Sequence, residues 1–182
     1  MKAALALPAG MLVSRQSVAQ APSSLALTPE CRDKVEATLW QTEGPFYSPR
    51  APRKDSLVQQ GAGGERITVI GLVLAPDCKP LPQAMLDIWH TDEKGEYDNS
   101  GFRFRGHLFA DAQGRFRFET VMPGLYPGRT RHIHVKVQPP GKRLLTTQLY
   151  FAGDPGNARD GIYRPELQMK REGVAWRFDF VI

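Results

Sequence analysis

Most of the chain alternates apolar and polar residues in short runs that are separated by turn residues. Such alternation places every second side chain on one face of a strand, so each run predicts a half-buried β-strand. The predicted strands cover residues 66–74, 84–90, 106–110, 115–119, 130–138, 144–151 and 174–181. Residues 111–114 are expected to form a hairpin turn. Strands at this spacing, without long helical patterns between them, predict an all-β, single-domain β-sandwich.

The N-terminal part of the chain differs from the rest. Residues 1–27 combine short apolar runs with a small-residue cleavage pattern at Ser17-Val18-Ala19, and form either an export signal or a leader or disordered arm. An export signal would send the protein to the periplasm or beyond; without it the protein stays in the cytoplasm. Residues 28–182 are the predicted domain, which starts with a short segment, helical over 30–40 and then irregular.

The composition is that of an ordinary globular protein, with 41% hydrophobic and 24% charged residues in 182. Lysine plus arginine number 24 against 19 acidic residues, and 24 − 19 gives a net charge of +5. Six arginines alternate with apolar residues, which favours the solvent-facing side of a sheet over a nucleic-acid surface; they are Arg103, Arg105, Arg115, Arg117, Arg129 and Arg131. No apolar run reaches 18 residues, so no membrane span is expected.

The chain has two cysteines, Cys31 and Cys78. A bridge between them would close a loop of 78 − 31 + 1 = 48 residues and stabilise the fold by roughly 4 kcal/mol in the chain-entropy model. A disulfide requires an oxidising compartment, so the bridge and the export signal support each other. Two unpaired thiols are the alternative.

Two histidines lie two residues apart in the predicted strand 130–138. His132 and His134 therefore leave the same face, while Ile133, Val135 and Val137 point into the core. Taken alone, such a pair is equally consistent with core histidines.

Two tyrosines complete a candidate ligand set. Tyr97 follows a glycine turn, and Tyr126 lies between two prolines. Each could instead be structural, the first at a strand end and the second as a buried aromatic beside a turn. Two imidazoles and two phenolates would give four donors with two negative charges, which suits a hard trivalent ion better than zinc.

Several motifs occur together with Trp89 over about two thirds of the chain. They are Thr42-Glu43-Gly44-Pro45-Phe46-Tyr47, Gly95-x-Tyr97, Pro123-Gly124-x-Tyr126-Pro127, Arg129-x-x-His132-Ile133-His134 and Gln148-Leu149-Tyr150-Phe151-x-Gly153-Asp154. In these motifs the chain resembles the intradiol ring-cleaving dioxygenases, the family of the protocatechuate and catechol dioxygenases. The Arg-x-x-His-x-His element with its glutamine sixteen residues after the first histidine is the most specific part.

The resemblance implies a mononuclear non-haem Fe(III) site in a β-sandwich, with Tyr97, Tyr126, His132 and His134 as ligands. It implies insertion of both atoms of O2 into a catechol-type ring, which gives a muconate-type diacid. Tyr126 would leave the metal when the catechol binds and accept one of its protons.

The resemblance also assigns roles around the metal. Arg129 would lie against the substrate ring and stabilise developing negative charge, and Gln148 would hydrogen-bond nearby. Tyr47 and Trp89 would wall the substrate pocket, with core packing as the alternative for Trp89. His90 and His107 have no partner at ligand spacing and are taken as structural or surface groups. Formation of a homo-oligomer and the need for a companion subunit stay open.

Two other functions compete with the dioxygenase. Residues 71–126 also resemble the non-catalytic β-sandwich modules of secreted proteins, which bind or stiffen without iron. Such a module has no reason to keep Arg129, His132, His134 and Gln148 together. A zinc hydrolase built on His132 and His134 lacks an acidic third ligand at a recognisable spacing.

Overall fold

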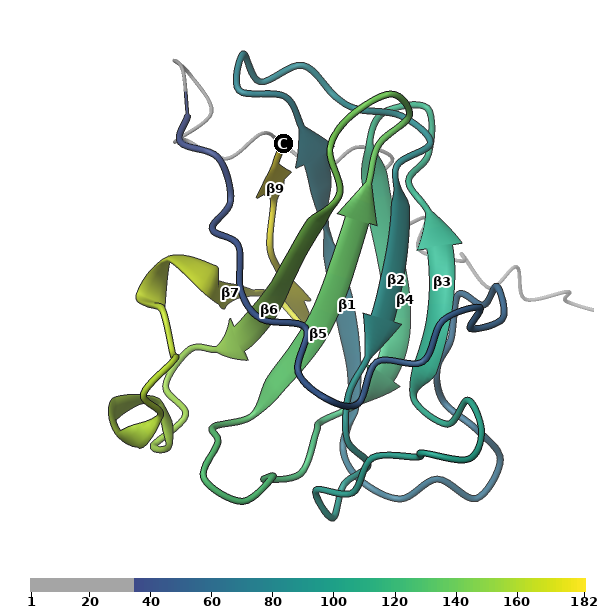
Figure 1. Ribbon diagram of the computed structural model, residues 1–182, viewed down its shortest axis with the longest axis vertical. Coiled ribbons are helices and arrows are strands. Elements are labelled where there is room, and N and C mark those ends of the chain that lie inside the picture. The colour runs from purple at the N-terminus through teal and green to yellow at the C-terminus, as the bar shows by residue number, and fades with distance from the viewer. Residues whose placement is uncertain (1–34) are drawn as a thin grey trace, which may run out of the picture.

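A computed structural model describes residues 35–182 of the chain (Figure 1). The elements of this part are β1 (Arg66–Leu74), β2 (Met85–Trp89), β3 (Arg105–Phe109), β4 (Arg115–Val121), β5 (His132–Gln138), β6 (Leu145–Phe151), the 3-10 turns η1 (Asn157–Arg159) and η2 (Pro165–Leu167), β7 (Gln168–Glu172), β8 (Ala175–Arg177) and β9 (Phe180–Val181). The predicted leader, residues 1–27, and Cys31 lie outside the described residues. Export and the Cys31–Cys78 disulfide therefore stay predictions.

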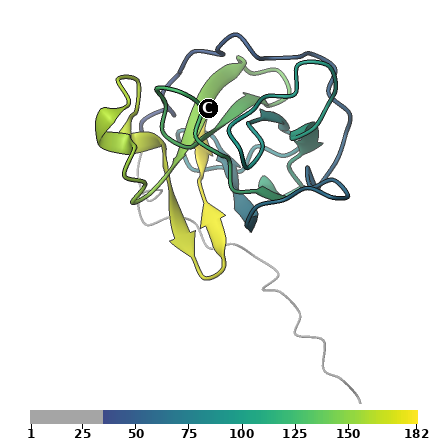
Figure 2. The same cartoon turned by 90° about the horizontal axis from the view of Figure 1, so that it is seen from below.

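The strands form one mixed sheet that folds over into two layers (Figure 1). One layer has the order β3-β2-β5-β6, and the other has the order β8-β1-β4 with β9 beside β1. β7 connects the layers because it pairs parallel with β6 and antiparallel with β8. Seen from below, the β7–β8 hairpin projects from the side of the sandwich (Figure 2). The predicted β-sandwich is confirmed.

The hydrophobic core lies between the two layers. Alternate residues of each central strand point inward, as the polar–apolar pattern predicted. Ile133, Val135 and Val137 of β5 are fully buried in this cluster. Their partners from the other strands include Ile67, Val69, Val73, Leu86, Ile88, Phe116, Phe118 and Leu149. This inward packing leaves the opposite face of β5 for the two histidines.

The predicted hairpin at residues 111–114 is wrong in its pairing. The tight turn is present, and the Gly114 N–H donates to the Asp111 carbonyl oxygen at 3.0 Å. However, β3 pairs with β2 and β4 pairs with β1. The turn therefore carries the chain from one layer to the other, and local turn chemistry does not reveal which strands pair on either side.

The segment before β1 has no helix in its described part. Residues 35–40 of the predicted helix 30–40 are irregular, so that prediction is wrong over this stretch. The Thr38 N–H donates to the Val181 carbonyl at 2.9 Å, and the Gln41 N–H donates to the Thr146 carbonyl at 2.9 Å. Hydrogen bonds to β6 and β9 thus replace those of a helix. None of the helical turns within residues 35–182 is long and apolar enough to cross a bilayer.

Candidate metal centre

The predicted functional residues of the strands gather at one end of the β3-β2-β5-β6 layer. His132 and His134 are the first and third residues of β5, and their side chains lie on the face away from the core. The strand register places Tyr150 opposite His132 and Gln148 opposite His134. On the other side of β5, Trp89 lies opposite His134. Three neighbouring strands therefore present these side chains as one patch.

The two tyrosines come from loops that touch through glycines. The Gly124 N–H donates to the Asp92 carbonyl at 2.7 Å. A Cβ atom on Gly124 would lie only 2.2 Å from the Gly95 backbone nitrogen, so the backbones approach closely because no side chain intervenes. Tyr97 and Tyr126 each follow one of these glycines by two residues. Their ring centroids consequently lie 5.8 Å apart in an edge arrangement.

Three of the four predicted donor atoms converge on one point. The Tyr97 Oη atom is 3.2 Å from His132 Nε2 and 3.1 Å from His134 Nε2. Adjacent ligands bonded to one ion at about 2.1 Å lie about 3 Å from each other, so this spacing fits a shared metal. Tyr126 is beside the group, and its hydroxyl makes no hydrogen bond to any residue from 35 to 182.

Three atoms of this group can each present a lone pair toward the others. His132 Nδ1 lies 2.7 Å from the Thr130 carbonyl and donates to it, so Nε2 carries a lone pair. Tyr97 has one hydroxyl proton and faces two Nε2 atoms. His134 Nδ1 is buried without a partner in the described part of the chain. Tyr97 Oη and the two Nε2 atoms face one point and can each offer a lone pair to it, so the residues fit a metal ion.

The electrostatics of the site agree with a highly charged cation. Burial lowers the pKa of His132 to about 4 and lowers the pKa of His134 well below its usual value, so both imidazoles are neutral at pH 7. Burial also raises the pKa of Tyr97, and the charges of Arg129 and Arg105 only partly oppose this. A tyrosinate at neutral pH therefore requires a stronger positive charge than these arginines provide.

Arg129 and Gln148 lie in one hydrogen-bond network beside the histidines. Arg129 Nη2 donates to Gln148 Oε1 at 2.7 Å, and Gln148 Nε2 donates to the Thr42 carbonyl at 2.9 Å. Arg129 Nε donates to Asp160 Oδ2 at 2.8 Å. Burial raises the pKa of Asp160. Hydrogen bonds from the Thr130 and Ile162 backbone N–H groups and from Arg129 outweigh this effect and keep that pKa below its usual value. The network fixes a guanidinium beside the donor group.

Tyr150 and Asp160 belong to this network, and sequence reasoning assigned neither a role. The Tyr150 hydroxyl donates to Gln41 Oε1 at 2.6 Å and lies 3.4 Å from Arg129 Nη2. Tyr150 could have been found, because it lies two residues after Gln148 on the same strand and shares its face. Asp160 is in an irregular loop, where no periodicity points to it.

Residues 41–47, which we name the site strap, run over the donor group. The Phe46 ring stacks on the Tyr97 ring, with centroids 4.4 Å apart. A Cβ atom on Gly44 would lie 3.4 Å from His134 Cε1. The strap thus reaches two of the predicted ligands.

The two predicted pocket walls lie next to the strap. Trp89 is 1% exposed and stacks on His134 at a centroid distance of 4.9 Å, so it packs behind this ligand. Tyr47 packs on Trp89 at 4.8 Å and donates its hydroxyl to Asp87 Oδ2 at 2.9 Å. Contact of either residue with a substrate stays a prediction.

The sequence pattern predicted that Arg105 lies on the solvent-facing side of a sheet, and this prediction is wrong. Its side chain is 1% exposed, with Nε donating to the Asp98 carbonyl at 2.9 Å and Nη1 donating to the Phe46 carbonyl at 2.5 Å. Its guanidinium carbon lies 5.9 Å from the centroid of the Tyr97 ring. The arginine therefore connects the Tyr97 loop to the strap.

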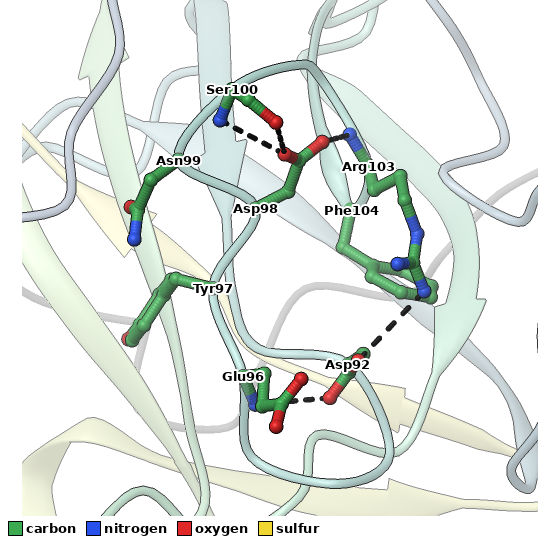
Figure 3. Close-up of a pocket in the computed structure, with 8 residues that line it drawn as sticks. All are labelled: Asp92, Glu96, Tyr97, Asp98, Asn99, Ser100, Arg103 and Phe104. Carbon is green, nitrogen blue, oxygen red and sulfur yellow. Dashed lines mark hydrogen bonds and ion pairs between the residues drawn. The ribbon is translucent and has the colours of Figure 1, made fainter.

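A cavity of about 330 Å³ lies inside the loop that carries Tyr97. Asp98 accepts hydrogen bonds from the Ser100 and Arg103 backbone N–H groups across the loop at 3.1 and 2.9 Å (Figure 3). Tyr97 points away from Arg103 and Phe104, which close the other side (Figure 3). The cavity thus belongs to the scaffold that holds Tyr97, and of the predicted ligands only Tyr97 lines it.

The other two histidines form hydrogen bonds to nearby residues and lie outside the donor group. His90 is buried, with Nδ1 and Nε2 each 2.6 Å from an oxygen atom of Thr91 and Thr120, respectively. His107 Nδ1 lies 2.7 Å from the Ala51 carbonyl. Within residues 35–182 no group of three His, Cys, Asp or Glu side chains could hold a metal. The zinc hydrolase hypothesis therefore finds no third ligand there.

Comparisons with known proteins agree on one family. A family model described as Dioxygenase matches residues 42–175. Hydroxyquinol 1,2-dioxygenase of Nocardioides simplex is 30% identical over 155 residues, or 72% of this chain and 52% of that enzyme. Catechol 1,2-dioxygenase of Acinetobacter baylyi is 31% identical over 156 residues, or 70% of this chain and 50% of that enzyme.

A solved structure is also similar in fold and sequence. It is the dioxygenase domain of a dioxygenase carbohydrate-binding protein fusion from the cellulolytic bacterium Streptomyces sp. SirexAA-E. The match has a TM-score of 0.77 and 48% identity, and covers 81% of this chain and 98% of that domain. The chain spans about half the length of the curated relatives it matches. All three proteins are dioxygenases, which favours the enzyme over a non-catalytic module.

Proposed function

This chain belongs to the intradiol dioxygenase family, and we propose that it opens a catechol-type ring with O2 to give a muconate-type diacid. A ferric ion would be held by Tyr97, Tyr126, His132 and His134. The observation that supports this most directly is the approach of Tyr97 Oη to both Nε2 atoms, at 3.2 and 3.1 Å.

When bound to these residues, a ferric ion would supply Lewis-acid chemistry for a catechol-type substrate. The protein contributes a proton acceptor through Tyr126. Its hydroxyl oxygen has no hydrogen-bond partner among residues 35–182, in contrast to Tyr97. As a phenolate, Tyr126 Oη can therefore accept a proton from a substrate hydroxyl without first breaking a protein contact.

The Arg129 guanidinium supplies fixed positive charge. Two of its nitrogens are held by Asp160 and Gln148, so it does not have to reorganise when negative charge develops on a bound ring. Gln148 is 0% exposed and is itself held by the Thr42 carbonyl. A flat aromatic substrate also suits the aromatic surroundings that Phe46 and Tyr126 provide.

The test is to load the purified protein with ferric ion, measure bound iron, record the visible spectrum and follow O2 uptake with catechol. We expect one iron per chain, a phenolate-to-iron charge-transfer band, and a diacid product containing both oxygen atoms from labelled O2. A chain that binds no iron after reconstitution, or an iron-loaded chain that consumes no O2 with catechol, hydroxyquinol or protocatechuate, would contradict the proposal.

Ligand variants separate the roles of the two tyrosines. Tyr97→Phe should lose iron binding, because Tyr97 Oη contacts both histidines. Tyr126→Phe should still bind iron but with a shifted visible band. Tyr163→Phe is a matched control, because Tyr163 lies outside the donor group and, among residues 35–182, its hydroxyl is hydrogen-bonded only to Gln168. Iron content of Tyr97→Phe equal to that of the control would remove Tyr97 from the ligand set.

A further inference from the structure

Asp160 is a buried carboxylate whose two oxygens are both engaged. Its side chain is 2% exposed. Oδ2 accepts from Arg129 Nε at 2.8 Å and from the Thr130 N–H at 3.0 Å, and Oδ1 accepts from the Ile162 N–H at 3.1 Å. Two backbone N–H groups therefore fix the carboxylate independently of the arginine. This geometry makes Asp160 a rigid anchor for the guanidinium.

The guanidinium of Arg129 is consequently held at two points. Asp160 binds Nε, and Gln148 Oε1 accepts from Nη2 at 2.7 Å, with the Tyr150 hydroxyl 3.4 Å from the same nitrogen. Arg129 Nη1 donates to no acceptor among residues 35–182. The protein thus fixes the plane of the guanidinium and leaves one nitrogen free for a ligand.

The same loop also holds the chain between Arg129 and the metal ligand. Asp154 accepts from Thr130 Oγ1 at 3.1 Å and from Arg131 Nη1 at 2.8 Å. The Thr130 carbonyl accepts from His132 Nδ1 at 2.7 Å. The backbone that Asp160 binds through the Thr130 N–H therefore leads directly to His132.

We propose that Asp160 is the positioning residue for Arg129 in ring cleavage, acting through the guanidinium and not by contact with the substrate. This rests on the proposed function. An arginine side chain has several rotatable bonds, and an arginine that is held only by Gln148 can turn its free nitrogen away from the ring. Small displacements of a catalytic group lower the rate of the chemical step more than they weaken substrate binding.

The first test is Asp160→Asn in the iron-loaded enzyme. Asparagine has the same shape but only one oxygen, so it cannot accept from Ile162 on one side and from Arg129 on the other. We expect kcat to fall by about tenfold or more with a small change in KM. Iron content and the visible band should stay as in the wild type, because no predicted metal ligand is altered. Wild-type kcat in Asp160→Asn would overturn the inference.

A double-mutant cycle with Arg129→Ala distinguishes positioning from a general structural effect. If Asp160 acts through Arg129, then adding Asp160→Asn to Arg129→Ala should produce no further loss of kcat. Equal losses in both backgrounds would refute the inference. Should Asp160→Asn not fold, Arg129→Lys tests the same anchoring, because lysine offers one nitrogen in place of the two that Asp160 and Gln148 hold in a fixed plane. Full activity of Arg129→Lys would then overturn it.

Asp111→Asn is the matched control. Asp111 also accepts from an arginine Nε, that of Arg115 at 2.6 Å, and from backbone N–H groups, but it lies at the opposite end of the strands. It should retain wild-type kcat. Failure of the proposed function looks different from failure of this inference. In that case the wild-type protein consumes no O2, or Arg129→Ala is as active as the wild type.

Discussion

The contact between the two tyrosine loops can be tested by substituting Gly124 with alanine. The added Cβ would lie 2.2 Å from the Gly95 nitrogen and 2.6 Å from the Glu93 carbonyl oxygen. An ordinary contact needs about 3.5 Å, so the backbones must separate by about 1.3 Å, which is 3.5 − 2.2. Tyr126 would then move away from Tyr97.

The size of the effect follows from the contacts that the separation breaks. Overpacking in a tight site costs about 1–3 kcal/mol. The Gly124 N–H donates to the Asp92 carbonyl at 2.7 Å and the Thr91 hydroxyl donates to the Gly124 carbonyl at 3.1 Å. Losing these two hydrogen bonds adds about 1 kcal/mol each. The free energy of unfolding should therefore fall by about 3–5 kcal/mol, and the charge-transfer band of the iron-loaded protein should weaken.

Urea denaturation and visible absorption measure the two effects. Gly161→Ala is the control, because a Cβ there meets no atom of residues 35–182 within 4 Å and the residue is not in the left-handed region. This control should leave both quantities close to those of the wild type. A Gly124→Ala variant with wild-type unfolding free energy and wild-type absorbance would refute the claim that this glycine contact brings the tyrosines together.

Two further predictions concern buried charges. Arg105→Met should lower the free energy of unfolding by about 3–5 kcal/mol in chemical denaturation, because the buried carbonyls that the arginine binds lose their donors. The control Arg103→Met, on the surface, should change the free energy of unfolding by less than about 0.5 kcal/mol. Similar values for the two variants would contradict the prediction. Burial lowers the pKa of His90 to about 4 from the usual 6.5, so the unfolded chain binds its proton first and stability present above pH 6.5 is lost as the pH falls toward 4. In denaturation between pH 7 and 4, His90→Gln should therefore lose stability less steeply than the wild type, and an unchanged slope would refute the assignment.

Most strands could be predicted because each buries one face and exposes the other. β7 could not, since Lys170, Arg171 and Glu172 are all exposed and the strand depends on pairing with β6 and β8. The partners of β3 and β4 could not be predicted either, because a turn sequence does not encode to which layer the next strand belongs.

The residues of the candidate site likewise divide into those that strand periodicity predicts and those that depend on tertiary contacts. His132 and His134 follow from strand periodicity, which fixes their common face. The approach of Tyr97 and Tyr126 depends on two loops that are distant in sequence, so only the family resemblance suggested it. Arg105 and Asp160 look like surface charges in the sequence, and only tertiary contacts reveal their burial.

The site strap makes the candidate metal centre depend on a segment that contributes no strand. Gln41 holds Tyr150, Thr42 holds Gln148, and Phe46 covers Tyr97. The strap is attached just upstream, where the Thr38 backbone and hydroxyl bond to Val181. For protein engineering, an affinity tag, protease site or fused domain inserted between Thr38 and the strap would loosen the site while leaving the sandwich folded.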